Sequence, residues 1–250
     1  MTCSISELTK FEVHARDGRV GRVKDVYFDD DRLIVRHLVV DTGGWITGRQ
    51  VLVSPHAVER LDHDSRTIVA NLSRDQIEKA PGIDTDKPVS RQHEMEHYDY
   101  YGYPYYWTGF ETWGALAYPM AYAGQAAGAG AAGAIAADQR DAAPADRVAA
   151  EEREALRRAS DPHLRSSSEV IGYHIRAVDG SIGSLDDLLF DEGTWRITQL
   201  IVDTGKWLPG KRVGVAAERL HGVDWAQREV EVNLTREDIK ASSPADADGT

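Results

Sequence analysis

The triplet Asp-Thr-Gly occurs twice, as Asp41-Thr42-Gly43 and Asp203-Thr204-Gly205, each time directly after an apolar run. Two aspartates supplied by two lobes can share one proton and hydrolyse a peptide bond at acid pH. The same triplet also forms a tight turn, because Asp and Thr side chains bond to nearby backbone and Gly adopts positive φ. The next residues are Gly-Trp and Lys-Trp, where such hydrolases have small hydroxylated residues. We therefore interpret both triplets as turns.

A second chemical motif is His93-Glu94-Met95-Glu96-His97. On a helix, this spacing directs two imidazoles at one zinc ion and provides a glutamate as general base. The flanking residues are polar or aromatic and give no apolar stripe that would bury such a helix. We interpret the motif as part of a polar linker and predict no metal site there.

Other signs of catalysis are weak. The run Asp29-Asp30-Asp31 lacks the glycine and the terminal glutamate of a calcium loop, and is typical of a solvated hairpin tip. No glycine-rich phosphate loop follows a strand, and no nucleophile has a catalytic setting. We predict no catalytic, cofactor-binding or metal-binding residues, and hence a protein that is not an enzyme.

The elements that position these motifs form an internal repeat. The segment 17–77 aligns with 179–239 without a gap, and about a third of the aligned positions are identical. Within each copy, short runs of β-branched residues alternate with Gly and Asp turns, which favours a small all-β barrel or sandwich. A short helix should end each copy, since Ser73 with Gln76, and Thr235 with Asp238, stand at N-cap and N3 positions.

The order of motifs resembles the PRC-barrel domain. It runs from Gly-x-Val/Leu-x-Asp through Phe-Asp and Asp-Thr-Gly-x-Trp-x-x-Gly to Asn-Leu-Ser/Thr-Arg, in both copies. The family is named for the cytoplasmic domain of the photosynthetic reaction centre H subunit and also occurs in a ribosome-maturation factor. The run from Tyr98 to Trp107 is similar to the tyrosine-rich tail of stand-alone bacterial members. This resemblance implies compact β-barrels that serve as docking or assembly modules rather than as enzymes.

These observations predict an all-β protein with two small PRC-type β-barrels, each followed by a short helix. The expected domains are a first barrel at 5–80, a linker at 81–167, a second barrel at 168–240 and a disordered tail at 241–250. We expect the linker to be largely irregular and partly disordered, with a short helix near 145–159. Ala and Gly make up most of its uncharged stretch, 114–137, which favours a spacer over a membrane span.

Aromatic side chains are the candidates for contact with a partner. Trp45 and Trp207 each lie in a glycine-flanked loop, where they either anchor a partner or fold back to cap the barrel. Tyr101, Tyr105 and Trp107 belong to the aromatic segment, residues 98–113. This segment either packs on a barrel or its dimer mate, which we favour, or serves as a docking tail.

The formal net charge is −12, and half of it lies between residues 81 and 169. It disfavours nucleic acid as a partner of the whole chain. The single cysteine, Cys3, fits a reducing cytoplasm, although peripheral attachment to the inner face of a membrane stays open. No cofactor is expected.

We predict a non-catalytic tandem adaptor that docks to a protein complex, with homo-oligomerisation left open. One alternative, from the resemblance, is an accessory protein of a photosynthetic reaction centre or of electron transport. The other is a bilobal aspartic-type hydrolase that uses Asp41 and Asp203.

Overall fold

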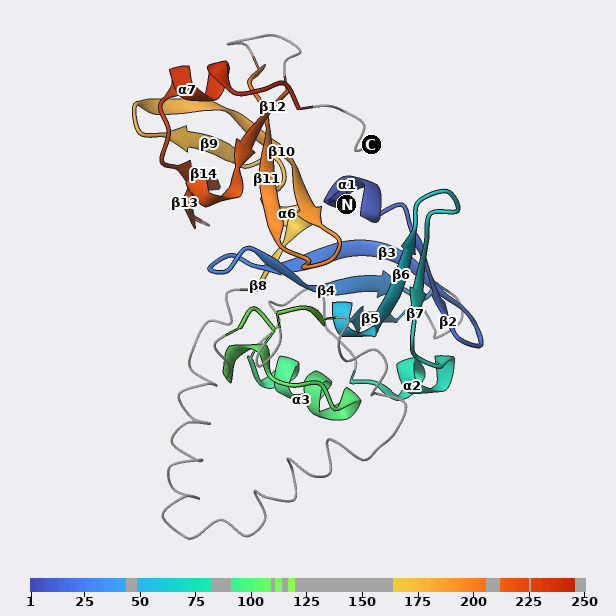
Figure 1. Ribbon diagram of the computed structural model, residues 1–250. Coiled ribbons are helices and arrows are strands. Elements are labelled where there is room, and N and C mark those ends of the chain that lie inside the picture. The colour runs from blue at the N-terminus through green and yellow to red at the C-terminus, as the bar shows by residue number, and fades with distance from the viewer. Residues whose placement is uncertain are drawn as a thin grey trace, which may run out of the picture.

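The computed structural model describes residues 1–43, 49–81, 91–108, 111–113, 117–119, 164–205, 212–224 and 226–245. Two seven-stranded sheets account for most of this part of the chain (Figure 1). The all-β prediction is therefore confirmed.

The first sheet has the strand order β5-β4-β3-β2-β7-β6. Its strands are β2 (Glu12–Ala15), β3 (Gly18–Asp29), β4 (Ile34–Asp41), β5 (Gln50–Val53), β6 (Val58–Asp62) and β7 (Thr67–Ala70). The 3-10 helix η1 (Pro55–Ala57) joins β5 to β6, and helix α2 (Arg74–Lys79) follows β7. We call β2–β7 together with α2 the first unit.

The second sheet repeats this order as β12-β11-β10-β9-β14-β13. Its strands are β9 (His174–Ala177), β10 (Gly180–Asp191), β11 (Ile197–Asp203), β12 (Arg212–Ala216), β13 (Leu220–Asp224) and β14 (Glu229–Val232). The 3-10 helix η5 (Ala217–Arg219) and helix α7 (Arg236–Ala241) complete the second unit. Both α2 and α7 begin at the predicted N-caps, Ser73 and Thr235, and each forms a capping box. The internal repeat in sequence is thus also a repeat in topology.

The ring of strand pairings is open in both units. Among the described residues, no ladder joins β5 to β6, or β12 to β13. In the first unit the chain turns between these strands through η1, where Pro55 has no N–H to donate to a ladder. The predicted barrels are therefore curled sheets that hydrogen bonds do not close.

Each unit receives one strand from the other. Strand β1 (Thr2–Ser4) pairs with β10, and its counterpart in the repeat, β8 (Leu164–Ser166), pairs with β3. A one-turn helix follows each of them, α1 (Ile5–Leu8) and α6 (Ser167–Val170). The predicted domain starts, at residues 5 and 168, fall just after strands that belong by hydrogen bonding to the opposite sheet.

A second contact between the units has the same reciprocity. The Val35 N–H donates to the Trp195 carbonyl at 2.9 Å, and the Ile197 N–H donates to the Leu33 carbonyl at 2.7 Å. Between them, Ile34 and Arg196 form an antiparallel bridge. Ile34 and Arg196 occupy equivalent positions of the repeat. The two hydrogen bonds that flank their bridge are also equivalent to each other. An approximate two-fold axis therefore relates the two units.

Part of the predicted linker is ordered on the first unit. Residues 91–101 form helix α3 (Arg91–Tyr101), and η2 (Tyr106–Thr108) follows it. Figure 1 shows α3 on one side of the first sheet and the second unit on the other. The interpretation of His93–His97 as a polar linker is therefore wrong: this segment is a helix, and its buried face is made of polar and aromatic side chains.

The predicted helix near 145–159 lies outside the described residues, as does most of 114–137. No helix in the described part of the chain combines the length and apolarity that crossing a membrane requires.

Candidate binding surfaces

The two Asp-Thr-Gly triplets form turns at the ends of β4 and β11. The Asp41 carboxylate accepts a hydrogen bond from the Gly43 N–H at 2.8 Å, and the Asp203 carboxylate accepts one from Gly205 at 2.9 Å. Both glycines have positive φ, 59° and 56°. The triplets thus have the local geometry that the turn interpretation predicts.

The arrangement of the strands also keeps the two carboxylates apart. Asp41 lies seven residues beyond the Ile34–Arg196 bridge along β4, a run of about 23 Å at the rise of a strand. Asp203 lies seven residues beyond Arg196 in the other unit, at a similar distance. A shared proton needs carboxylates in direct contact, so this geometry does not make an aspartic hydrolase site.

The glycine that begins the repeated Gly-x-Val/Leu-x-Asp motif, Gly21 in the first unit and Gly183 in the second, has a packing role. A Cβ atom added to Gly21 would lie 2.0 Å from the Asp41 carbonyl oxygen, and one added to Gly183 would lie 1.9 Å from that of Asp203. Backbone-to-backbone contact this close leaves room only for glycine. The glycine of the Gly-x-Val/Leu-x-Asp motif is therefore explained by the packing of the backbone.

The aspartate of the same motif holds the exchanged strands. Asp25 accepts hydrogen bonds from Ser166 Oγ at 2.6 Å, Ser167 Oγ at 2.8 Å and the Ser168 N–H at 3.0 Å. In the other direction, Asp187 accepts from Ser4 Oγ and from the Ser6 N–H at 3.1 Å. One carboxylate per unit thus fixes the strand that arrives from the other unit.

Helix α3 places a carboxylate and a histidine inside the protein. Glu94 is fully buried; its Oε1 accepts from the Tyr106 hydroxyl at 2.8 Å and lies 3.4 Å from His37 Nε2. His97 Nε2 lies 3.0 Å from the carbonyl oxygen of Leu52 on β5. Through these contacts Glu94 and His97 hold helix α3 on β4 and β5, so both side chains have a packing role. No group of three or more metal-ligating side chains occurs among the described residues.

Burial keeps the histidines of this face neutral. It lowers the pKa of His97 to about 3 and that of His56 to about 4, against an ordinary value of 6.5. The Pro119 carbonyl, 3.0 Å from His56 Nδ1, opposes the lowering at His56. Both imidazoles therefore pack as uncharged rings at neutral pH.

Arg36 anchors the rest of the aromatic segment. It is fully buried, donates to the Asp29 carboxylate at 3.2 Å and to the Thr112 carbonyl at 2.8 Å, and lies over the rings of Tyr106 and Trp113. Trp113 in turn donates from Nε1 to the Thr194 carbonyl of the second unit at 3.1 Å. The segment thus contacts both units.

Three predicted contact residues lie in this segment. Tyr101, Tyr105 and Trp107 are partly buried and pack against the core. The rings of Tyr105 and Trp107 stack with centroids 4.8 Å apart. The segment therefore packs on the first unit and is not a free docking tail. The other two predicted residues, Trp45 and Trp207, lie outside the described residues.

Comparison with known families agrees with this architecture. Residues 3–77 match the model of the PRC-barrel domain. The first unit is a PRC-barrel domain. No curated protein matches the chain.

Each unit has a surface hollow among its described residues. One lies on the PRC-barrel domain next to the Asp41 turn, has a volume of about 640 Å³ and is lined by Arg19, Arg22 and Arg74. Arg19 and Arg22 both lie near one carboxylate, Glu12, at 2.9 and 3.6 Å. Asp41 also lines the hollow, so two carboxylates, Glu12 and Asp41, offset part of the charge of the three arginines.

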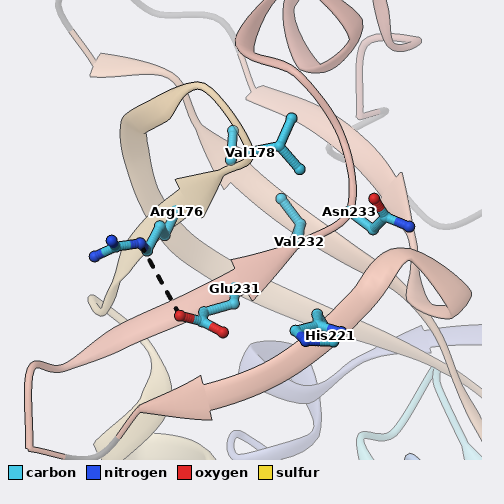
Figure 2. Close-up of a pocket in the computed structure, with 7 residues that line it drawn as sticks. Arg176, Val178, His221, Glu231, Val232 and Asn233 are labelled. Carbon is cyan, nitrogen blue, oxygen red and sulfur yellow. Dashed lines mark ion pairs between the residues drawn. The ribbon is translucent and has the colours of Figure 1, made fainter.

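The other hollow lies between β9, β13 and β14 of the second unit and has a volume of about 350 Å³. Figure 2 shows Val178, Val232 and Asn233 on one side of it and the Arg176–Glu231 ion pair on the other. The PRC-barrel domain has different side chains at the corresponding positions, among them Arg16 in place of Val178.

Sequence reasoning missed Asp25, Asp187 and Val178, and it placed Glu94 in a polar linker. Asp25 and Asp187 were visible as the repeated aspartate of the motif, but nothing in their spacing reveals the partner serines. Val178 could have been found by asking where the two copies differ in charge, because Arg16 corresponds to it.

Proposed function

We propose that this protein is a non-catalytic assembly module in which two PRC-type units present two different surfaces to a protein complex. The observation that carries the proposal is the reciprocal exchange of β1 and β8, which joins the units through ladders in both sheets. These ladders give the two units a fixed scaffold for binding, and the motifs that suggested chemistry have packing roles.

The second unit is part of this proposal as a second PRC-type copy. Its strand order is that of the PRC-barrel domain, and each of its main elements begins at or near the residue that aligns with the start of its counterpart. The identical positions of the repeat include the turn residues that the fold requires.

The two units differ in what covers them. Every residue from Ile34 to Val40 in β4 is buried, because α3 and the aromatic segment lie over the outer face of the sheet. On β11 of the second unit the corresponding face carries Thr198 and Gln199, which are partly or fully exposed. The second unit therefore offers a partner a sheet face that is covered in the first unit.

The test is quantitative crosslinking in cells of the source organism, with the full chain as bait and mass spectrometry as readout. We expect a defined set of proteins to be enriched and to saturate with bait. Changing Trp45→Ala and Trp207→Ala together should reduce that enrichment at least several-fold, and Tyr118→Ala, an exposed aromatic, serves as control. Enrichment of background proteins only, or acid-pH peptide cleavage that Asp41→Asn abolishes, would overturn the proposal.

A further inference from the structure

Val178, which lines the hollow on the second unit, stands where the PRC-barrel domain has Arg16. The backbones around the two positions have the same hydrogen bonds. The Arg16 N–H donates to Leu72 O at 2.9 Å, and the Val178 N–H donates to Leu234 O at 3.0 Å. The two sites thus differ in side chains on a shared frame.

In the PRC-barrel domain the guanidinium of Arg16 binds Asn71 at two points. Nε donates to Asn71 Oδ1 at 2.6 Å, and an Nη donates to the Asn71 carbonyl at 3.1 Å. Two neighbouring oxygens accepting from one planar fork is the geometry that distinguishes arginine from lysine. Asn71 is an intermediate residue in exposure, partly covered by this contact.

In the second unit the corresponding asparagine, Asn233, has lost that donor. Val178 cannot donate, and its side chain is 65% exposed, one of few large apolar side chains so exposed among the described residues. Asn233 is exposed. Its backbone is nevertheless held as in the first copy, since its N–H donates to Arg219 O at 2.8 Å, against 2.7 Å from Asn71 to Ala57 O.

The charges around the hollow favour a cation. Glu229 and Glu231 stand where the PRC-barrel domain has Thr67 and Val69. Arg176 lies 2.7 Å from the Glu229 carboxylate and 4.0 Å from that of Glu231, so one positive charge faces two negative ones. The two glutamates therefore outnumber the one arginine in this region, and of the two only Glu231 lines the hollow itself.

We propose that this hollow binds the arginine side chain of a partner protein, with its guanidinium on Asn233 in the way that Arg16 binds Asn71, and its methylene stem against Val178. Glu231 adds an anionic acceptor at the edge of the site. This inference rests on the proposed function, because it specifies how the second unit recognises a protein.

The test is a titration of the ¹⁵N-labelled full chain, with the side-chain amide signal of Asn233 as readout. The probes are N-acetyl-arginine amide, N-acetyl-lysine amide and free arginine. We expect saturable shifts with N-acetyl-arginine amide and at least fivefold weaker binding of the lysine probe. Free arginine should bind no more tightly than N-acetyl-arginine amide. Equal binding of the arginine and lysine probes, or binding of free arginine alone, would overturn the proposal.

Two matched variants exchange the sites. Val178→Arg should supply the missing guanidinium from within the chain and weaken probe binding at least tenfold. Arg16→Val should open a hollow on the first copy and make the Asn71 amide respond to the probe, although more weakly, because Thr67 and Val69 replace the two glutamates. Unchanged probe binding in Val178→Arg would contradict the inference. The result is independent of the crosslinking test. The hollow can bind the arginine probe even if no partner is captured, and a partner can be captured even if the hollow binds no probe.

Discussion

At the scale of single residues, Asp25 and Asp187 carry a task that a carboxylate performs well. Each accepts several hydrogen bonds at once from a chain segment that arrives from the opposite unit. A serine hydroxyl or a backbone N–H gains more from an ionised acceptor than from a neutral one. The repeated aspartate is therefore a clamp for the exchanged strand.

Replacing Asp25 by Ala should lower the free energy of unfolding by about 2–3 kcal/mol, because it leaves several donors around a partly buried position without their acceptor. Urea denaturation of the full chain measures this change. Asp31→Ala is the matched control, since Asp31 lies in the same long hairpin but is exposed, and it should change stability by less than about 0.5 kcal/mol. Equal effects of the two substitutions would contradict the role of Asp25.

At the scale of elements, the strands follow from the sequence and α3 does not. Strands β3, β4, β5 and β7 coincide with runs of β-branched residues between Gly and Asp turns, which is the all-β signal of the sequence. The inward face of α3 is made of Glu94, His97 and Tyr98. An apolar periodicity cannot reveal such a helix, because Glu94 and His97 are polar and their partners, on β4, on β5 and at Tyr106, come from other parts of the chain.

Of the elements around the candidate binding surfaces, the turns could be predicted from the sequence and the exchanged strands could not. The turns at Asp41 and Asp203 rest on contacts between near neighbours, which short motifs encode. Strands β1 and β8 are very short and pair with strands more than half the chain away. Such short strands have no periodicity of their own, so only the folded chain reveals them.

The attachment of α3 should weaken in acid. Because the folded-state pKa values of His56 and His97 are depressed to about 4 and 3, protons bind the unfolded state first as the pH falls below 6.5. Stability is therefore complete above pH 6.5 and decreases toward the folded pKa values. Between pH 6.5 and 4.5 the loss should be about 2–3 kcal/mol per histidine.

Urea denaturation at a series of pH values measures this dependence. His97→Gln should reduce the slope of stability against pH in that window, because it removes one titrating group. His174→Gln, at an exposed position, should leave the slope unchanged. A wild-type protein whose stability does not change between pH 6.5 and 4.5 would contradict the buried, neutral state of these rings.

At the scale of the whole molecule, the exchange of strands links the stability of the two units. Neither sheet can be complete while the other is unfolded, because each contains a strand from the opposite half of the chain. The core also continues from one unit into the other as one cluster of buried side chains.

We therefore expect one cooperative thermal transition, with equal calorimetric and van't Hoff enthalpies. Asp187→Ala should shift this transition downward as a whole rather than split it. Differential scanning calorimetry distinguishes the outcomes, and two separate transitions in the unaltered chain would show that the units unfold independently.

The approximate two-fold axis at the Ile34–Arg196 bridge has a consequence for how the protein can diversify. In a dimer of identical chains, any substitution appears on both sides of the axis, so a surface that gains a function on one side gains it on the other. Here the two units are separate segments of one polypeptide, so each has its own sequence. A change such as Arg16 to Val178 can alter one side while its twin keeps the original contact. The molecule thus combines the packing of a symmetric pair with the freedom to be asymmetric in recognition.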